Sequence, residues 1–254
     1  MTPAADLLTP PELAEVVEHS TGKALALMLY GSYARGTQQF DSDVDLLEIV
    51  AESPAPYSRG TVNVTQYTPA HLHEMAQRGS LFVLHLLTDG IFILDESGVL
   101  DRALRAYRQP ASYQPVWNQL SVVAGAVNLA APDVEQYQHG LCRLALYTLR
   151  TAVYLKSIES GTPCFDADLA AENLDIAGLA QALKMRRQSE FSFQDLEILA
   201  RLLDRVLPAP IRRENRSTLS YAVANSASKD LAALFATVLG PGDIEYSALS
   251  VPPF

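Results

Sequence analysis

Two aspartates, Asp43 and Asp45, stand one residue apart at the start of an apolar run, and ten residues separate them from a Gly31-Ser32 pair. Because residues i and i+2 of an extended strand point to the same face, the two carboxylates are predicted to lie side by side. Like charges at that separation repel each other unless a cation lies between them. A pair of oxygen ligands with no nearby histidine or cysteine suits a hard ion such as Mg²⁺, whose coordination substrate phosphates complete.

The Gly31-Ser32 pair has the residue types for contact with a phosphate. A turn with a small residue lets backbone N–H groups and the Ser32 hydroxyl approach phosphate oxygens, and a helix that starts there favours an anion. Arg35 follows within the same turn and would add positive charge. The stretch therefore predicts a site for a metal-bound polyphosphate, at which phosphoryl or nucleotidyl transfer proceeds by positioning and charge neutralisation.

The first part of the chain has strand and helix patterns in close succession. Residues 24–30 and 44–50 are apolar runs of strand length, so we expect both strands to be buried on two faces. The other elements expected here are strands over residues 61–67 and 91–94, helices over residues 10–20, 69–78 and 80–89, and a loop over residues 53–60. This order predicts a small α/β or α+β sheet domain.

From about residue 109 the chain has only helical patterns. We expect helices over residues 116–130, 134–160, 166–187, 194–207 and 217–239. The predicted fold class is therefore α+β, with a small sheet domain over residues 1–108 followed by an all-helical domain over residues 116–254.

Composition limits the classes of partner. The chain has 254 residues, 48% of them hydrophobic, and a net charge of −10, which disfavours binding to nucleic acid through phosphate contacts. No apolar run reaches the roughly 20 residues that cross a bilayer, so no membrane partner is expected. The N-terminus lacks the pattern of a secretory signal, so we expect a cytoplasmic protein whose two cysteines are reduced.

The runs GSYARG and SDVDLL together resemble the signature of the DNA polymerase β-like nucleotidyltransferase superfamily, specifically its small members with Gly-Ser-x10-Asp-x-Asp. These members include the minimal nucleotidyltransferases of toxin–antitoxin pairs and the antibiotic adenylyltransferases. The resemblance covers roughly residues 24–95, and the second half is more weakly similar to the helical domain of the adenylyltransferases. It implies a mixed sheet with flanking helices, ATP or another nucleoside triphosphate as co-substrate with its phosphates on Gly31 and Ser32, and Mg²⁺ on Asp43 and Asp45.

Members of the superfamily usually carry a third carboxylate on the next central strand, where it shares a metal and often activates the acceptor hydroxyl. The aligned position here holds Asn63, and an amide is a weaker metal ligand that cannot act as a base. The base therefore comes from elsewhere, or the acceptor needs none, or the domain binds a nucleotide without turning it over. His85 is the first candidate for a replacement base, although its apolar surroundings also suit a hydrogen-bonded core histidine; Glu135 and His139 come next.

The leading hypothesis is an enzyme that transfers a nucleotide, AMP from ATP, to a hydroxyl of a small molecule, with the helical domain on the acceptor's side. The acidic net charge suits a cationic acceptor such as an aminoglycoside. One alternative is a protein adenylyltransferase of the toxin–antitoxin type, which modifies a protein hydroxyl. The other is a nucleotide-binding regulatory protein whose catalysis is weakened by the replacement at Asn63.

Overall fold

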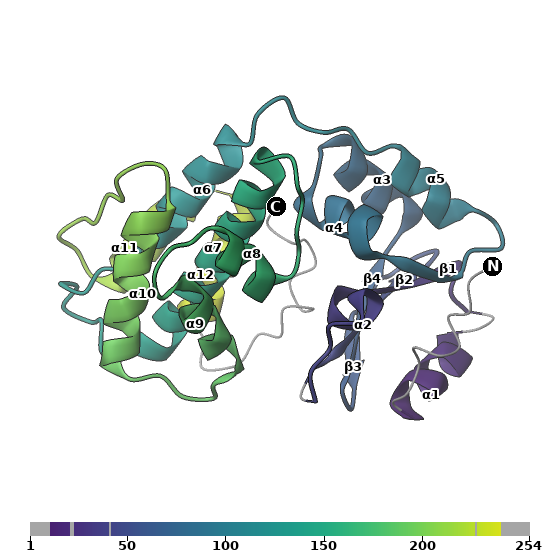
Figure 1. Cartoon of the computed structure of the whole chain (residues 1–254), viewed down its shortest axis with the longest axis horizontal. Coiled ribbons are helices and arrows are strands. Elements are labelled where there is room, and N and C mark those ends of the chain that lie inside the picture. The colour runs from purple at the N-terminus through teal and green to yellow at the C-terminus, as the bar shows by residue number, and fades with distance from the viewer. Residues whose placement is uncertain (1–10, 21–22, 41, 227, 240–254) are drawn as a thin grey trace. The chain divides into compact units, whose positions relative to one another are not determined.

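The computed structural model describes residues 11–20, 23–40, 42–226 and 228–239, which form two compact units that meet in the sequence at Ala111 and Ser112. The first unit contains a five-stranded sheet. Every regular element described in the second unit is a helix (Figure 1). The predicted fold class, α+β with a sheet followed by helices, is confirmed.

The sheet of the first unit is mixed, with the strand order β3-β4-β2-β1-β5. Its strands are β1 (Ala26–Tyr30), β2 (Val44–Ile49), β3 (Tyr57–Arg59), β4 (Val62–Tyr67) and β5 (Ile91–Leu94). Strand β1 is antiparallel to β2 and β5, whereas β2 and β4 run parallel. The two apolar runs of the sequence are the two strands β1 and β2, which have neighbours on both sides, and they are buried on both faces as predicted.

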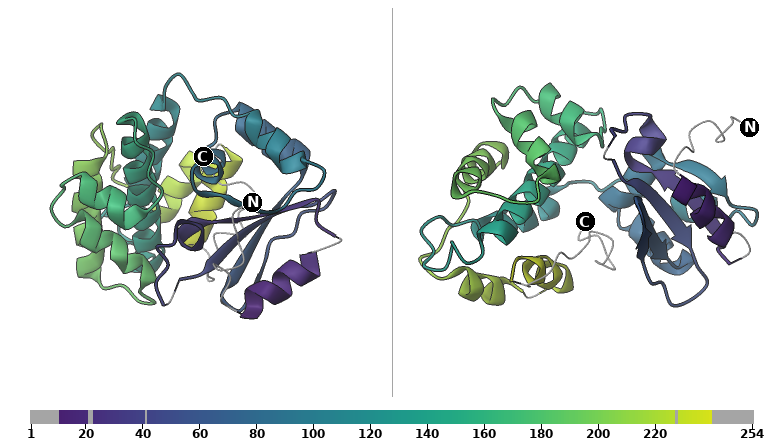
Figure 2. Two further views of the ribbon diagram at one scale, coloured as in Figure 1. Left: turned by 45° about the vertical axis from the view of Figure 1, so that its right-hand side comes forward. Right: turned by 90° about the horizontal axis from the view of Figure 1, so that it is seen from below.

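Helices cover both faces of this sheet (Figure 2). On one face, Leu13 and Val16 of α1 (Pro11–Ser20) pack against a cluster that includes Leu29 and Leu46. The other face is covered by α3 (Pro69–Gln77), α4 (Leu81–Asp89) and α5 (Val99–Arg105). Leu47 lies on this second face, so strand alternation places Asp45 there as well.

Two elements of the first unit were not expected. Residues 53–60 were predicted as a loop, but Tyr57–Arg59 forms the short edge strand β3, whose pairing with β4 is a tertiary contact that the proline-rich local sequence conceals. Helix α5 begins after Gly98, and the Asp95 carboxylate accepts hydrogen bonds from the N–H groups of Leu100 and Asp101. This start signal lies several residues before the helix, outside the usual capping position.

The second unit is organised around α7 (Gln138–Glu159). Around it pack α6 (Gln114–Gly125), α8 (Ala167–Asn173), α10 (Phe193–Val206) and α12 (Lys229–Leu239). Because helices surround it, α7 is buried along most of its length, including Leu141, Leu149 and Leu155.

Four of the helices predicted in this unit differ from those observed. The helix expected over residues 116–130 is α6, which ends at Gly125, five residues earlier. The helix expected over residues 166–187 is divided into α8, α9 (Leu179–Lys184) and a 3₁₀ turn (Met185–Arg187), because Asp175 and Gly178 have left-handed backbone conformations that end a helix. The helix expected over residues 217–239 is divided into α11 (Thr218–Asn225) and α12. The helix expected from residue 134 begins only at Gln138, after a series of turns over residues 132–137. The apolar residues keep a helical spacing through these breaks, so the sequence pattern did not reveal where the helices end.

Both cysteines are free thiols, as predicted, and burial raises the pKa of Cys142 to about 12. A thiol with so high a pKa is not a nucleophile at neutral pH. Among the described residues, no helix combines the length and the apolar character that spanning a membrane requires.

Asp133 fixes the start of α11 from a distant part of the chain. Its carboxylate accepts hydrogen bonds from the backbone N–H groups of Thr218 at 2.6 Å and Leu219 at 3.3 Å. Burial raises the pKa of this carboxyl, but the backbone hydrogen bonds outweigh burial, and the net result is a pKa below the ordinary 3.8. A lowered pKa means that the folded state holds this group as a carboxylate and is stabilised by it.

We expect Asp133→Asn to lower the free energy of unfolding by about 0.3–1 kcal/mol at pH 7, the usual contribution of a negative charge at a helix N-terminus. Because the folded pKa is depressed, this stabilisation is present above the unfolded pKa and is lost as the pH falls through the folded pKa. The difference between the two proteins should therefore be smaller at pH 3 than at pH 7, measured as denaturant midpoints. Glu172→Gln, which changes an exposed carboxylate on α8, is the control and should be neutral. An equal difference at both pH values would contradict the assigned role of the charge.

Candidate functional site

The site begins where β1 ends and its neighbour β2 starts. The antiparallel register pairs Tyr30 with Asp45, and the next residue, Gly31, lies against the Asp45 side chain. Gly31 has a φ of +76°, and a Cβ on Gly31 would lie 2.5 Å from Asp45 Oδ2. The carboxylate thus lies directly over the glycine backbone. No other residue fits here, because a side chain would both strain the backbone and displace Asp45.

Ser32 and Arg35 are held by the short helix α2 (Gly31–Arg35). The helix ends in a Schellman motif at Gly36, whose φ is +71°: the Thr37 N–H donates to the Ser32 carbonyl at 3.0 Å and the Gly36 N–H to the Tyr33 carbonyl at 3.3 Å. This explains the second glycine of GSYARG. Because Ser32 and Arg35 are three residues apart on a helix, their side chains are neighbours on its surface.

The carboxylate pair lies at the beginning of β2. Asp43 immediately precedes the strand and is exposed, whereas Asp45 is partly buried within it. Asn63 of β4 is the parallel register partner of Asp45, and its Oδ1 accepts a hydrogen bond from the Ser58 hydroxyl of β3 at 2.8 Å. An amide therefore lies beside Asp45 at the position where a third carboxylate would stand.

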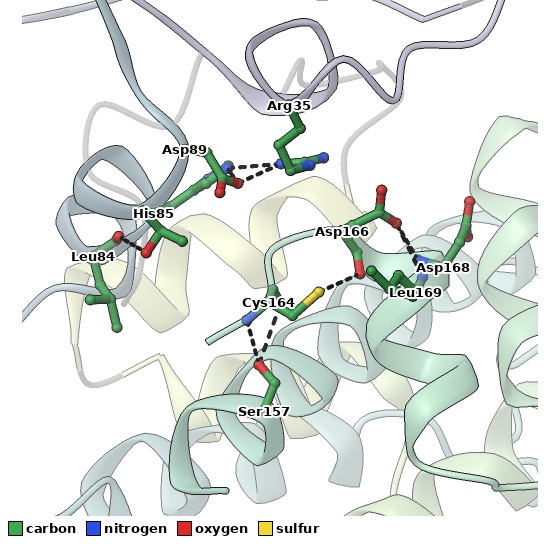
Figure 3. A network of polar contacts seen from close by, with 10 residues as sticks. Arg35, Leu84, His85, Asp89, Ser157, Cys164, Asp166, Asp168 and Leu169 are labelled. Carbon is green, nitrogen blue, oxygen red and sulfur yellow. Dashed lines mark hydrogen bonds and ion pairs between the residues drawn. The ribbon is translucent and has the colours of Figure 1, made fainter. Parts of the chain in front are cut away.

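Arg35, His85 and Asp89 form a network between α2 and α4 (Figure 3). Asp89 Oδ2 lies 2.7 Å from Arg35 Nη1 and 3.2 Å from His85 Nε2, and the last two atoms are 3.4 Å apart. Burial raises the pKa of Asp89, but the hydrogen bonds and charges of His85 and Arg35 outweigh it, so the pKa is lowered overall. Asp89 is therefore a carboxylate at neutral pH.

Tyr30 links this network to the carboxylate pair. Its ring makes an edge-to-face contact with the His85 ring, with 5.7 Å between the centroids, and its hydroxyl lies 3.2 Å from Thr65 Oγ1 of β4. Since Tyr30 is the register partner of Asp45, His85 borders the same face of the sheet as Asp45 and Asn63.

The other predicted candidates belong to the second unit. Glu135 is exposed in the turns before α7, and His139 is exposed in the first turn of α7, with its ring 5.2 Å from that of Phe191. Asp89 was not among the site residues predicted from the sequence. The spacing of four between His85 and Asp89, which makes them neighbours on a helix, is a signal that could have found it.

The donors expected for a metal are few. Within the part of the chain that the structure describes, no three or more His, Cys, Asp and Glu side chains gather closely enough to hold a metal ion. The expected protein ligands are the two carboxylates of Asp43 and Asp45. Two carboxylates fit Mg²⁺, which is commonly held by one or two of them together with substrate phosphates and water.

Comparison with known proteins decides the class of the first unit. Residues 12–74 match the family model described as nucleotidyltransferase domain. The first unit carries a nucleotidyltransferase domain. The match includes Gly31, Ser32, Asp43 and Asp45 and confirms the resemblance found in the sequence, while His85 and Asp89 lie beyond it.

Other comparisons add little to the nucleotidyltransferase match. A crystal structure of a nucleotidyltransferase-like protein from Exiguobacterium sibiricum 255-15 is 16% identical, with a TM-score of 0.29, and the likeness covers 76% of this chain and 72% of that one. A search among curated proteins found no significant match. The domain itself implies a nucleoside triphosphate as a substrate and transfer of a nucleotide as the general activity.

Gly31→Ala tests the packing between the glycine and Asp45, and Gly36→Ala is its matched control. Both glycines have a positive φ, so a strain of roughly 1–2 kcal/mol is common to the two variants. They differ in that a Cβ at position 31 would meet Asp45 Oδ2, whereas one at position 36 meets no atom within 4 Å. We expect Gly31→Ala to abolish Mg²⁺-dependent ATP binding and Gly36→Ala to retain it, measured by titration calorimetry. Equal affinities would show that this contact does not shape the site.

Proposed function

We propose that the protein is a Mg²⁺-dependent nucleotidyltransferase that moves AMP from ATP onto a hydroxyl of a small-molecule acceptor. One observation carries the proposal: the Asp45 carboxylate packs over the Gly31 backbone beside Ser32, inside a segment that matches the nucleotidyltransferase domain. This contact puts a carboxylate next to a turn that has the residue types for phosphate binding.

Each residue of this site has a role in the proposal. The Ser32 hydroxyl and the backbone beside it contact the phosphates, and the Arg35 guanidinium, which is paired with Asp89, lies one helical turn further on, where it can also donate hydrogen bonds to them. Asp43 and Asp45 would hold Mg²⁺, which when bound neutralises phosphate charge and favours an in-line displacement. Charge neutralisation and positioning account for most of the catalysis expected of such a site.

The transfer exchanges one P–O bond for another. The acceptor oxygen bonds to the α-phosphorus, the bond from that phosphorus to the β-bridging oxygen breaks, and pyrophosphate leaves with the electron pair. The hydroxyl proton must pass to a base, which the Asn63 amide cannot be. His85 is the proposed base, because its imidazole borders the same face of the sheet and imidazole is the side chain that most often acts as a general base.

Charge supports a cationic acceptor. The chain carries 29 acidic and 19 basic residues, an excess that attracts cations to its surface. An aminoglycoside-like molecule combines positive charge with the hydroxyl groups that the reaction needs. We assign acceptor binding to the helical unit as part of the same proposal.

A second candidate function is a regulatory protein that binds a nucleotide and transfers it slowly or not at all. The register of Asn63 with Asp45 favours it, because the sheet lacks a third carboxylate at that position. Losing a general base costs about 10²–10⁴ in rate but leaves phosphate binding intact.

Incubation with Mg²⁺ and α-phosphate-labelled ATP, GTP, CTP or UTP, together with aminoglycosides and candidate proteins, distinguishes these functions. Label on a small molecule supports the transferase. Label on a protein identifies a protein adenylyltransferase. Binding without transfer of label indicates the regulatory protein, and the absence of both binding and transfer would reject all three.

The double substitution Asp43→Asn with Asp45→Asn should remove both label transfer and Mg²⁺-dependent nucleotide binding, because amides are poor ligands for Mg²⁺. Asp101→Asn, which removes a surface carboxylate of the same unit that is paired with Arg105, is the control and should retain both. Transfer by the double variant would overturn the assignment of the metal ligands.

Asn63→Asp restores a third carboxylate to the sheet. The Ser58 hydroxyl can donate to a carboxylate as it does to the amide oxygen, so the variant should fold normally. We expect its kcat to rise, with a ceiling of about 10²–10⁴, the usual contribution of a general base. An unchanged kcat, together with complete loss in His85→Ala, would assign the proton transfer to His85 alone.

A further inference from the structure

Besides the metal ligands, the proposed transfer uses two further side chains, and a single carboxylate oxygen contacts both of them. Asp89 Oδ2 contacts both Arg35 Nη1 and His85 Nε2, and its side chain is only 9% exposed. Arg35 and His85 are also mostly covered, at 19% and 17%. A network so shielded from water keeps its geometry better than a surface ion pair would.

The backbone around Asp89 is firmly held. Asp89 is the last residue of α4, and a Cβ on the following Gly90 would lie 2.5 Å from Met28 Sδ of β1 and closer still to the Leu86 carbonyl oxygen. The end of the helix is therefore packed tightly against the sheet. Because His85 and Asp89 are four residues apart on α4, one rigid element carries both.

The chemistry of the three groups defines their protonation. An ionised carboxylate only accepts hydrogen bonds, so Arg35 donates to Asp89. His85 Nε2 lies 3.2 Å from Asp89 Oδ2 and 3.4 Å from Arg35 Nη1, and in a neutral ring it can donate to the first or accept from the second, but not both. The shorter contact, which is to a charged acceptor, favours a proton on Nε2. A proton on His85 Nε2 leaves Nδ1 of the neutral ring as the nitrogen that can accept a proton. A carboxylate that orients an imidazole in this way is a recurring device for preparing a base.

We propose that Asp89 is a positioning residue of the transfer site: it fixes the ring and tautomer of His85 and anchors the Arg35 guanidinium one turn from Ser32. Helix α4 then supplies, as His85, the base that the sheet lacks at Asn63. This inference rests on the proposed function.

A purely structural role for Asp89, as a clamp between α2 and α4, makes a different prediction. A clamp contributes to stability and leaves the turnover of the folded protein unchanged. A positioning residue also changes kcat and the state of the His85 ring. The decisive variant is therefore Asp89→Asn, which keeps the size of the side chain but removes its charge.

The matched control is Asp95→Asn in the same unit. Asp95 is also a carboxylate that accepts two hydrogen bonds, but from backbone N–H groups at the start of α5. We expect both variants to lower the melting temperature. Only Asp89→Asn should lower kcat, by about 10- to 100-fold, with a smaller change in KM for ATP. Equal kcat values for Asp89→Asn and the wild type would refute the proposal.

Ring ¹⁵N NMR gives a readout that does not need activity. The chain has 5 histidines, and the His85 signals are those that disappear in His85→Ala. The wild type should show His85 with the proton on Nε2, and Asp89→Asn should change the tautomer signals of this ring. Unchanged signals would refute the proposal even where kcat falls.

Rescue tests the link to Asn63. If α4 replaces the missing carboxylate of the sheet, Asn63→Asp should raise kcat more in the Asp89→Asn background than in the wild type. An equal gain in the two backgrounds would refute the replacement. Absence of transfer in the wild type would reject the proposed function itself, whereas wild-type transfer that Asp89→Asn leaves unchanged would reject only the role of Asp89.

Discussion

The close packing of the Asp45 carboxylate over the Gly31 backbone is the contact around which the first unit is arranged. It requires a left-handed glycine at the end of β1, an antiparallel register that places Asp45 opposite Tyr30, and a short helix that turns away at once. Gly36 ends that helix after one turn and a half, so the chain can return to start β2 beside β1. A shift of one residue in the register would turn Asp45 toward the α1 face and remove the site.

The sheet separates polar and apolar positions along each strand. On β2, Asp45 occupies the partly buried beginning of a face whose later positions, Leu47 and Ile49, are fully buried under α3, α4 and α5. Charge at the strand end and apolar residues further along allow one strand to serve both the site and the core. This division explains why the carboxylates stand at the start of the apolar run, where solvent has access and desolvation costs less.

The carboxylates at and near the site come from two different elements, the sheet and α4. The sheet provides Asp43 and Asp45 but an amide at Asn63, while α4 provides Asp89 with an imidazole beside it. An aspartate at position 63 would stand next to Asp45 in the register and would add a third negative charge to that end of the sheet. On α4, the charge of Asp89 is balanced by Arg35. Asp89 is thus a carboxylate near the site that adds little repulsion, because a neighbouring cation balances its negative charge.

The sequence by itself predicted the nucleotidyltransferase class and the central strands. The spacing of Gly31, Ser32, Asp43 and Asp45 is a local property of one turn and two strands, and the apolar runs that form β1 and β2 are long enough to be recognised from periodicity. It also pointed to Asn63 and His85, because both lie in elements with clear patterns. Only the tertiary structure decided that His85 and Arg35 share one oxygen of Asp89, that residues 57–59 form an edge strand, and that α8, α9, α11 and α12 are separate helices. The physical reason is that a hydrogen bond between two helices, or between an edge strand and its neighbour, depends on where distant segments lie, and local periodicity carries no information about that.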